Sequence, residues 1–154
     1  IMPLGLTVTS NRIYDAFLGE ETTKALLHGH SFTANPIACA VACANLDLLE
    51  QPIAIQGMKN LELWNQEFTL ELEKIECVTN IRQQGTIIAF EVISENGNTY
   101  FSDIKTKAYK YFLSQGVLLR PLGNVIFINP PLIISKEEYN KITKAILRFL
   151  KERN

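Results

Sequence analysis

Apolar residues recur every three or four positions in three long segments of the chain, and this spacing is typical of one face of a helix. The first segment opens at Pro52, and its apolar face comprises Met58, Leu61, Trp64, Phe68, Leu72 and Ile75. The second ends at Gly116, and the third begins at Ser135 and Glu138, a pair with capping-box spacing. The sequence therefore predicts three amphipathic helices in this part of the chain.

Runs of β-branched and apolar residues predict the strands. They lie at residues 6–9, 78–81, 86–93, 117–120 and 125–128. Residues 87–90 are apolar on both faces, which is typical of a central strand covered on both sides. Pro-Leu-Gly-Asn at 121–124 separates the last two runs and predicts a hairpin-like pair, which Pro130 and Pro131 end.

The first 50 residues predict two helices separated by a loop. Ser10 precedes a short helix that ends by Gly19, and residues 27–36 show no period and predict a loop. Asn35 then caps a helix that runs to about Glu50. Because that helix carries small residues on nearly every face, we expect it to be deeply buried.

These elements predict an α/β protein in two parts. A boundary near residues 49–52 separates residues 1–50, interpreted as the C-terminal edge of a larger α/β domain, from residues 51–154, a small α+β domain. The chain starts at Ile1 in an apolar run, without a charged leader or a cleavage site. We therefore expect a fragment of a longer protein, and no signal peptide.

Composition narrows the classes of partner. The chain has 154 residues, 47% of them hydrophobic, and a formal net charge of −1. Without a net basic charge, nucleic acid is not an expected partner. The longest apolar stretch is too short to span a bilayer, so we expect no membrane partner. Three cysteines without a regular framework predict reduced thiols.

Residue chemistry alone points to two candidate sites. The chain has two histidines, His28 and His30, and lacks further ligands spaced for a metal site. In the loop Gly29-His30-Ser31, a hydroxyl and free N–H groups suit an anionic oxygen, although residue chemistry alone favours an ordinary connecting turn with a hydroxyl cap. Arg120, held by the following proline, suits a carboxylate, although residue chemistry alone favours an exposed arginine or one in a structural ion pair.

Two segments resemble the class III aminotransferases, fold-type-I enzymes that use pyridoxal 5'-phosphate. The first, at residues 28–40, contains His-Gly-His-Ser-Phe-Thr-Ala-Asn-Pro. The second, Gly-Val-Leu-Leu-Arg-Pro-Leu-Gly-Asn at residues 116–124, continues to Pro-Pro-Leu-Ile-Ile-Ser at 130–135. The pair is similar to the branch of the family that transfers an amino group from S-adenosylmethionine to 8-amino-7-oxononanoate, in biotin biosynthesis. The resemblance covers the whole chain as the C-terminal part of such an enzyme.

The resemblance implies roles for individual residues. Ser31, usually a threonine in the family, would bind the cofactor phosphate of the neighbouring subunit, and His30 would contribute to the same site. The backbone of Gly29 would contact the keto-acid substrate, and Arg120 would pair with its carboxylate. Phe127 stands where some relatives carry a tyrosine near the substrate. A cytoplasmic homodimer acting on small-molecule substrates is implied as well.

The resemblance also implies that this chain contains no catalytic residue. The family's Schiff-base lysine lies just before a Gly-Gly-x-x-Pro-Leu stretch, the end of which resembles residues 2–5. The lysine is therefore expected upstream of Ile1, and the isolated chain is expected to be inactive. Two alternatives stay open: another class III aminotransferase acting on an ω-amino acid or amine, and a non-catalytic α+β dimerisation module.

Overall fold

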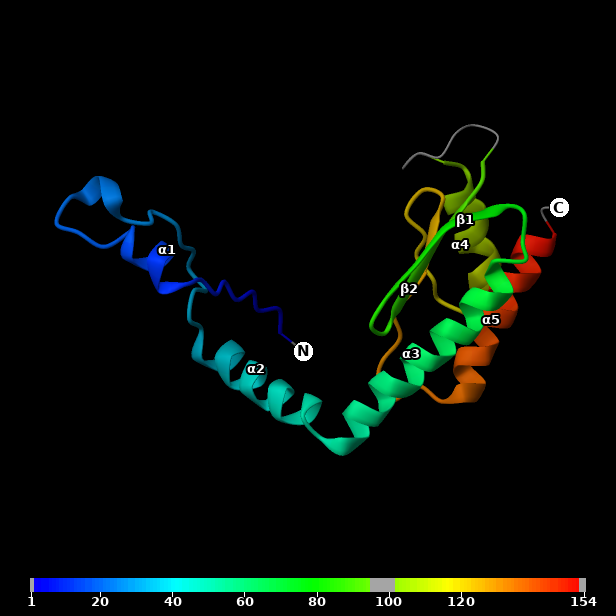
Figure 1. Cartoon of the computed structure of the whole chain (residues 1–154), viewed down its shortest axis with the longest axis horizontal. Coiled ribbons are helices and arrows are strands. Elements are labelled where there is room, and N and C mark those ends of the chain that lie inside the picture. The colour runs from blue at the N-terminus through cyan, green and yellow to red at the C-terminus, as the bar shows by residue number, and fades with distance from the viewer. Residues whose placement is uncertain (1, 95–101, 153–154) are drawn as a thin grey trace. The chain divides into compact units, whose positions relative to one another are not determined.

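The computed structural model describes residues 2–94 and 102–152, which form two compact units, residues 1–50 and 51–154. Helices and strands occur together, so the predicted α/β class is confirmed (Figure 1). Asn-Gly at residues 96–97 predicts a turn from the sequence, and this pair lies outside the described residues. The assignment of the two units to a large and a small domain stays a prediction.

The first unit contains two α-helices and a short 3₁₀ helix. They are α1 (Asn11–Asp15), η1 (Thr22–Lys24) and α2 (Pro36–Leu49). The predicted start of α2 is confirmed, because Asn35 Oδ1 accepts hydrogen bonds from the N–H groups of Ile37 at 3.0 Å and Ala38 at 3.2 Å. Pro36 occupies the first turn, where its missing N–H is not needed.

Two predictions for the first unit are wrong. Residues 6–9 form no strand, and β-propensity alone does not order a strand that has no partner for its backbone groups. Helix α2 is not deeply buried, since Ala38 is its one buried residue and the side chains of Ile37 and Leu46 are 65% and 59% exposed. The small residues of α2 permit close packing, but residues 2–50 place nothing over most of the helix.

In residues 51–94 and 102–152, the second unit consists of a three-stranded antiparallel sheet and three helices that pack beside it (Figure 1). The sheet order is β1 (Val78–Gln84), β2 (Ile87–Val92) and β3 (Val125–Ile128), which confirms the central place of β2. The helices are α3 (Pro52–Leu72), α4 (Ile104–Ser114) and α5 (Lys136–Lys151). All three were predicted from their periodicity.

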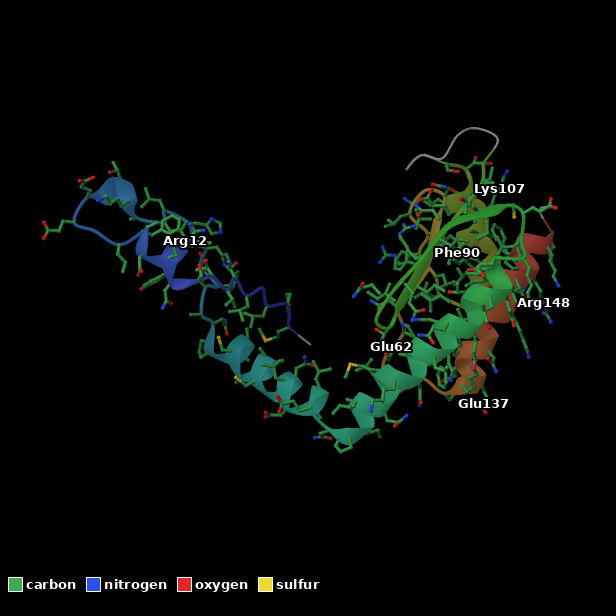
Figure 2. All side chains as sticks on the ribbon, in the orientation of Figure 1. Arg12, Glu62, Phe90, Lys107, Glu137 and Arg148 are labelled. Atoms are coloured by element: carbon green, nitrogen blue, oxygen red, sulfur yellow. The ribbon has the colours of Figure 1, made fainter. Side chains whose placement is uncertain are left out.

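The core lies between one sheet face and the helices. Alternate residues of β2, including Phe90, are fully buried against the apolar faces of α3, α4 and α5 (Figure 2). The opposite face of β2 is less covered, and Ile87 on that face is 42% exposed. The prediction that β2 is covered on both sides is therefore wrong, because the three helices bury only one face.

The hairpin between residues 117–120 and 125–128 is also not formed. Strand β3 pairs with β2 instead, with Ile88 opposite Ile128, and residues 117–120 are not a strand. A proline at 121 removes one backbone donor, and a single bridge between Leu122 and Val125 closes the turn before the chain could pair further back. Residues 117–120 are nevertheless held in place, because the side chains of Val117 and Leu119 are buried in the core.

Within residues 2–94 and 102–152, no single helix is long and apolar enough to cross a bilayer; only α2 and α3 taken as a pair reach the required length and hydropathy.

Candidate functional site

Alternating burial positions Arg120. Val117 and Leu119 are 6% and 9% exposed and anchor the segment in the core, whereas Leu118 and Arg120 are exposed. Because side chains alternate along extended backbone, Leu118 and Arg120 share the outer side. Buried Pro121 follows and fixes the next φ angle. The backbone is therefore held in place on both sides of Arg120.

A tight turn fixes the chain immediately after Arg120. Leu122 and Val125 exchange two backbone hydrogen bonds, each 2.9 Å long, across a turn in which Gly123 has a φ of +61°. Asn124 joins this turn to the end of β2, since its carbonyl oxygen accepts from the Val92 N–H at 2.9 Å and its Nδ2 donates to the Val92 oxygen at 3.3 Å. The turn is thus anchored to the central strand.

Arg120 lines a cavity of about 710 Å³. Its lining combines two cations, an aromatic phenol and apolar walls, from Lys105, Tyr109, Leu118, Arg120, Pro121, Leu122 and Phe127. Among the described residues, no carboxylate belongs to this lining, and none lies within ion-pair distance of Arg120. The structural ion pair considered as an alternative for Arg120 is therefore not observed there. An anionic ligand with an apolar chain suits this cavity.

The loop that contains the second candidate site is a compact turn in the first unit. The His30 N–H donates to Thr33 Oγ1 at 3.1 Å, and the Phe32 N–H donates to His30 Nδ1 at 3.3 Å. His30 also lines a separate hollow of about 760 Å³ together with Met2, Pro3, Leu4, Gly5, Phe32, Thr33, Ala34, Asn35 and Ala38. Gly29 and Ser31 are exposed, and a side chain added at Gly29 would meet open space.

The predicted residues fall into two groups. Gly29, His30 and Ser31 lie together in the first unit, and Arg120 lies in the second, so each group is described by itself. Their predicted roles stay predictions. Sequence reasoning missed Lys105 and Tyr109, which share the cavity with Arg120. Their spacing of four residues on α4, offset from the buried face, was a signal that could have indicated a common target.

A metal site finds no support among the described residues. No group of three or more histidine, cysteine, aspartate or glutamate side chains that could hold a metal ion occurs in residues 2–94 and 102–152. The three cysteines, Cys39, Cys43 and Cys77, are free in the structure.

Comparison with known proteins shows the family of the chain. The sequence model of the family described as Aminotransferase class-III matches residues 2–150. The chain belongs to the class III aminotransferases. It is 41% identical over 150 residues to the adenosylmethionine-8-amino-7-oxononanoate aminotransferase of Geobacter sulfurreducens, a match that covers 94% of this chain and 33% of that protein. The chain thus spans about a third of the length of the curated relatives it matches.

Solved structures of aminotransferases share the fold. The crystal structure of adenosylmethionine-8-amino-7-oxononanoate aminotransferase from Methanocaldococcus jannaschii matches with a TM-score of 0.78 and 29% identity, over 94% of this chain and 34% of that one. An amine transaminase from an uncultivated Pseudomonas species, in its PLP-bound form, matches with a TM-score of 0.73 and 26% identity, over 92% of this chain and 33% of that one. The architecture is therefore that of the C-terminal part of such enzymes.

Class III aminotransferases depend on pyridoxal phosphate, and the residues present fit one end of that cofactor. The exposed hydroxyl of Ser31 is a suitable donor to a phosphate oxygen. Lys24 is the one lysine in residues 1–50; it lies in η1, with its Nζ 4.0 Å from a carboxylate oxygen of Glu21. The loop therefore fits the phosphate end and offers no amine to the aldehyde end.

Proposed function

We propose that this chain is the C-terminal part of an aminotransferase that moves an amino group from S-adenosylmethionine to 8-amino-7-oxononanoate and yields 7,8-diaminononanoate. Relatives from Geobacter sulfurreducens, at 41% identity, and Synechococcus elongatus, at 36% identity, carry the name of this activity. The reaction belongs to biotin biosynthesis. On its own, the chain is expected to be inactive, because the lysine that tethers the cofactor is expected upstream of Ile1.

The observation that supports this proposal most is the setting of Arg120. The acceptor is a long alkyl chain with a carboxylate at one end and a ketone and an amine at the other. Arg120 lines a cavity whose other lining residues include Leu118, Leu122 and Phe127. A charge-assisted bond to the carboxylate and apolar contacts along the methylene groups would then orient the ketone away from Arg120.

The cofactor would be held by this chain through its loop in the first unit. Pyridoxal phosphate, when bound, supplies the electron-withdrawing ring on which amino-group transfer depends. We propose that the Ser31 hydroxyl donates to its phosphate and that His30 contributes to the same site, in the neighbouring subunit of a homodimer. The Gly29 backbone, which no side chain shields, would contact the acceptor. The homodimer and a cytoplasmic location stay predictions.

The choice of amino donor tests the proposal. The protein encoded by the complete gene is assayed with 8-amino-7-oxononanoate as acceptor and with S-adenosylmethionine, alanine or glutamate as donor, and 7,8-diaminononanoate is measured by mass spectrometry. We expect product with S-adenosylmethionine. Transfer of an amino group from an ω-amino acid or an amine to pyruvate, without any transfer from S-adenosylmethionine, would favour a different class III aminotransferase. No transfer with any donor would favour a non-catalytic dimerisation module.

A further inference from the structure

Helix α4 holds Tyr109 at the edge of its buried face. That face comprises Ile104, Ala108 and Phe112, all fully buried in the core. The ring of Phe112 lies 5.3 Å from the ring of Phe149 in α5, measured between centroids. Tyr109 follows Ala108 by one position, so it lies beside the buried face rather than on it. Packing of the core therefore fixes where the Tyr109 side chain leaves the helix.

The other two tyrosines described in the second unit belong to the core. The centroid of the Tyr111 ring lies 5.4 Å from that of Phe149. The Tyr139 hydroxyl donates to Asn65 Oδ1 at 2.7 Å. Tyr109 is instead 39% exposed and lines the cavity of about 710 Å³. Its ring is therefore accessible to a ligand in that cavity.

Apolar side chains from other parts of the second unit line the same cavity. Leu118 is 69% exposed and Leu122 is 49% exposed, and partly buried Phe127 of β3 lies with them in the lining. Large apolar side chains that a fold leaves in water, and that converge on one cavity, indicate a ligand with an apolar part. Tyr109 adds an aromatic ring to this lining and Arg120 adds a cation. A carboxylic acid with a long apolar chain suits both.

We propose that Tyr109 is a specificity-determining residue, whose ring packs along the methylene chain of the acceptor while Arg120 binds the acceptor's carboxylate. This inference rests on the proposed function. Contact between the ring and the methylene groups removes apolar surface of both from water, so each further methylene group in contact strengthens binding. Tyr109 therefore favours a long-chain acid over a short one, whereas Arg120 binds the group that both acids share.

The first test measures the acceptor KM in the protein encoded by the complete gene. Tyr109→Ser removes the ring, and Tyr109→Phe keeps it. We expect Tyr109→Ser to raise KM for 8-amino-7-oxononanoate by about fivefold to 20-fold, with kcat and the half-reaction with S-adenosylmethionine nearly unchanged. Tyr109→Phe should leave KM nearly unchanged. Leu113→Ser is the matched control and should not change KM, since Leu113 is a 52% exposed apolar residue of α4 that is not part of the cavity lining.

The second test measures the preference for chain length. Linear saturated carboxylic acids are assayed as inhibitors that compete with the acceptor. In the wild-type protein, the inhibition constant should fall by about threefold to fourfold for each added methylene group. The fall should be smaller in Tyr109→Ser and equal to that of the wild-type protein in Tyr109→Phe and Leu113→Ser.

The outcomes separate the role of Tyr109 from the proposed function. An equal rise in the acceptor KM for Tyr109→Ser and Tyr109→Phe, or an effect of Tyr109→Ser no larger than that of Leu113→Ser, would overturn the role of Tyr109 and leave the proposed function standing. The same chain-length dependence of inhibition in the wild-type protein and in Tyr109→Ser would do so as well. If the wild-type protein forms no 7,8-diaminononanoate, the proposed function fails and the inference fails with it.

Discussion

At the scale of single residues, a buried pair of polar side chains joins α3 to α5. The Tyr139 hydroxyl donates to Asn65 Oδ1 at 2.7 Å, and both residues are almost fully buried. Burial, with a smaller contribution from Glu67, raises the pKa of Tyr139 well above its ordinary value, so the hydroxyl stays a neutral donor. Asn65 Nδ2 has no hydrogen-bond partner among the described residues, which makes Tyr139 the partner on which the Asn65 side chain depends.

Removal of the Tyr139 hydroxyl should destabilise the chain. In Tyr139→Phe, Asn65 Oδ1 would remain buried but would no longer accept a hydrogen bond from the Tyr139 hydroxyl. We therefore expect the free energy of unfolding to fall by about 1–3 kcal/mol. Urea denaturation measures this change. In Asn65→Leu combined with Tyr139→Phe the loss should be smaller, since no buried amide is left unpaired. Tyr109→Phe, at an exposed hydroxyl, serves as the control, and an equal loss there would contradict the account.

The sequence identified a candidate site residue where the evidence lay in the residues next to it along the chain. Pro121 made Arg120 a candidate for a fixed guanidinium, and the structure adds the cavity and the apolar walls. Lys105 could not be recognised in the same way, because an exposed lysine on an amphipathic helix is typical of a solvated face. Its place in the cavity depends on how α4 packs against the core, which is non-local.

At the scale of elements, α3 passes close to the segment that precedes α5. A Cβ atom at Gly57 would collide with the backbone carbonyl oxygen of Leu132. Leu132 packs against the core and leads into the first turn of α5. The absence of a side chain at Gly57 thus permits the approach of two elements that are distant in the sequence.

Gly57→Ala should therefore be destabilising, against the usual trend. Within a helix, replacing glycine by alanine ordinarily stabilises by roughly 1 kcal/mol. Here the methyl group would have to displace backbone, and overpacking of this kind costs about 1–3 kcal/mol. Thermal unfolding of the variant measures the sign. Lys59→Ala, at an exposed position of the same helix, controls for propensity, and a rise in melting temperature for Gly57→Ala would contradict the contact.

The capping box at the start of α5 links its stability to pH. The Glu138 N–H donates to Ser135 Oγ at 3.2 Å, and the Ser135 N–H donates to Glu138 Oε2 at 2.9 Å. The bond from the Ser135 backbone, with a smaller contribution from its hydroxyl, lowers the pKa of Glu138 from 4.5. Because the folded pKa is depressed, the stabilisation is present above pH 4.5 and is lost as pH falls through the folded pKa.

Glu138→Gln should flatten this pH dependence. The variant lacks the titrating carboxylate, so its free energy of unfolding should decrease less than that of the wild-type chain as pH falls below about 4.5. Urea denaturation at pH 7 and at successively lower pH values measures the difference. Ser135→Ala removes the hydroxyl donor to the carboxylate but keeps the backbone N–H, so it should flatten the dependence only in part. Parallel curves for all three proteins would show that the capping box does not contribute to acid sensitivity.

The elements that could be predicted from the sequence are those with local causes. The stripes and end signals of α3, α4 and α5 lie within each helix, and Asn35 marks the start of α2 by bonds to the next turn. Residues 117–120 were mistaken for a strand because pairing is decided by distant residues, here by β2, which takes β3 as its neighbour. Residues 6–9 were mistaken for a strand for the same reason, because their own sequence does not decide whether another strand lies beside them.

At the scale of the whole molecule, the two compact units differ in how much they bury. The second contains the hydrophobic core, whereas α1 and η1 in the first have no buried residue. Hydrogen exchange of the 154-residue chain should therefore show strong protection in β2 and α5, and exchange close to that of unstructured peptide in α1 and η1. Equal protection in both units would contradict this distribution of stability.

The most direct test of the account concerns Arg120 and the two half-reactions of the protein encoded by the complete gene. Arg120→Ala should raise KM for 8-amino-7-oxononanoate by about 10- to 100-fold, equivalent to roughly 1.5–3 kcal/mol for a lost charge-assisted bond, and leave the half-reaction with S-adenosylmethionine nearly unchanged. Arg120→Lys should recover part of the loss. An equal effect on both half-reactions, or no change in the acceptor KM, would contradict the central claim that Arg120 binds the acceptor's carboxylate.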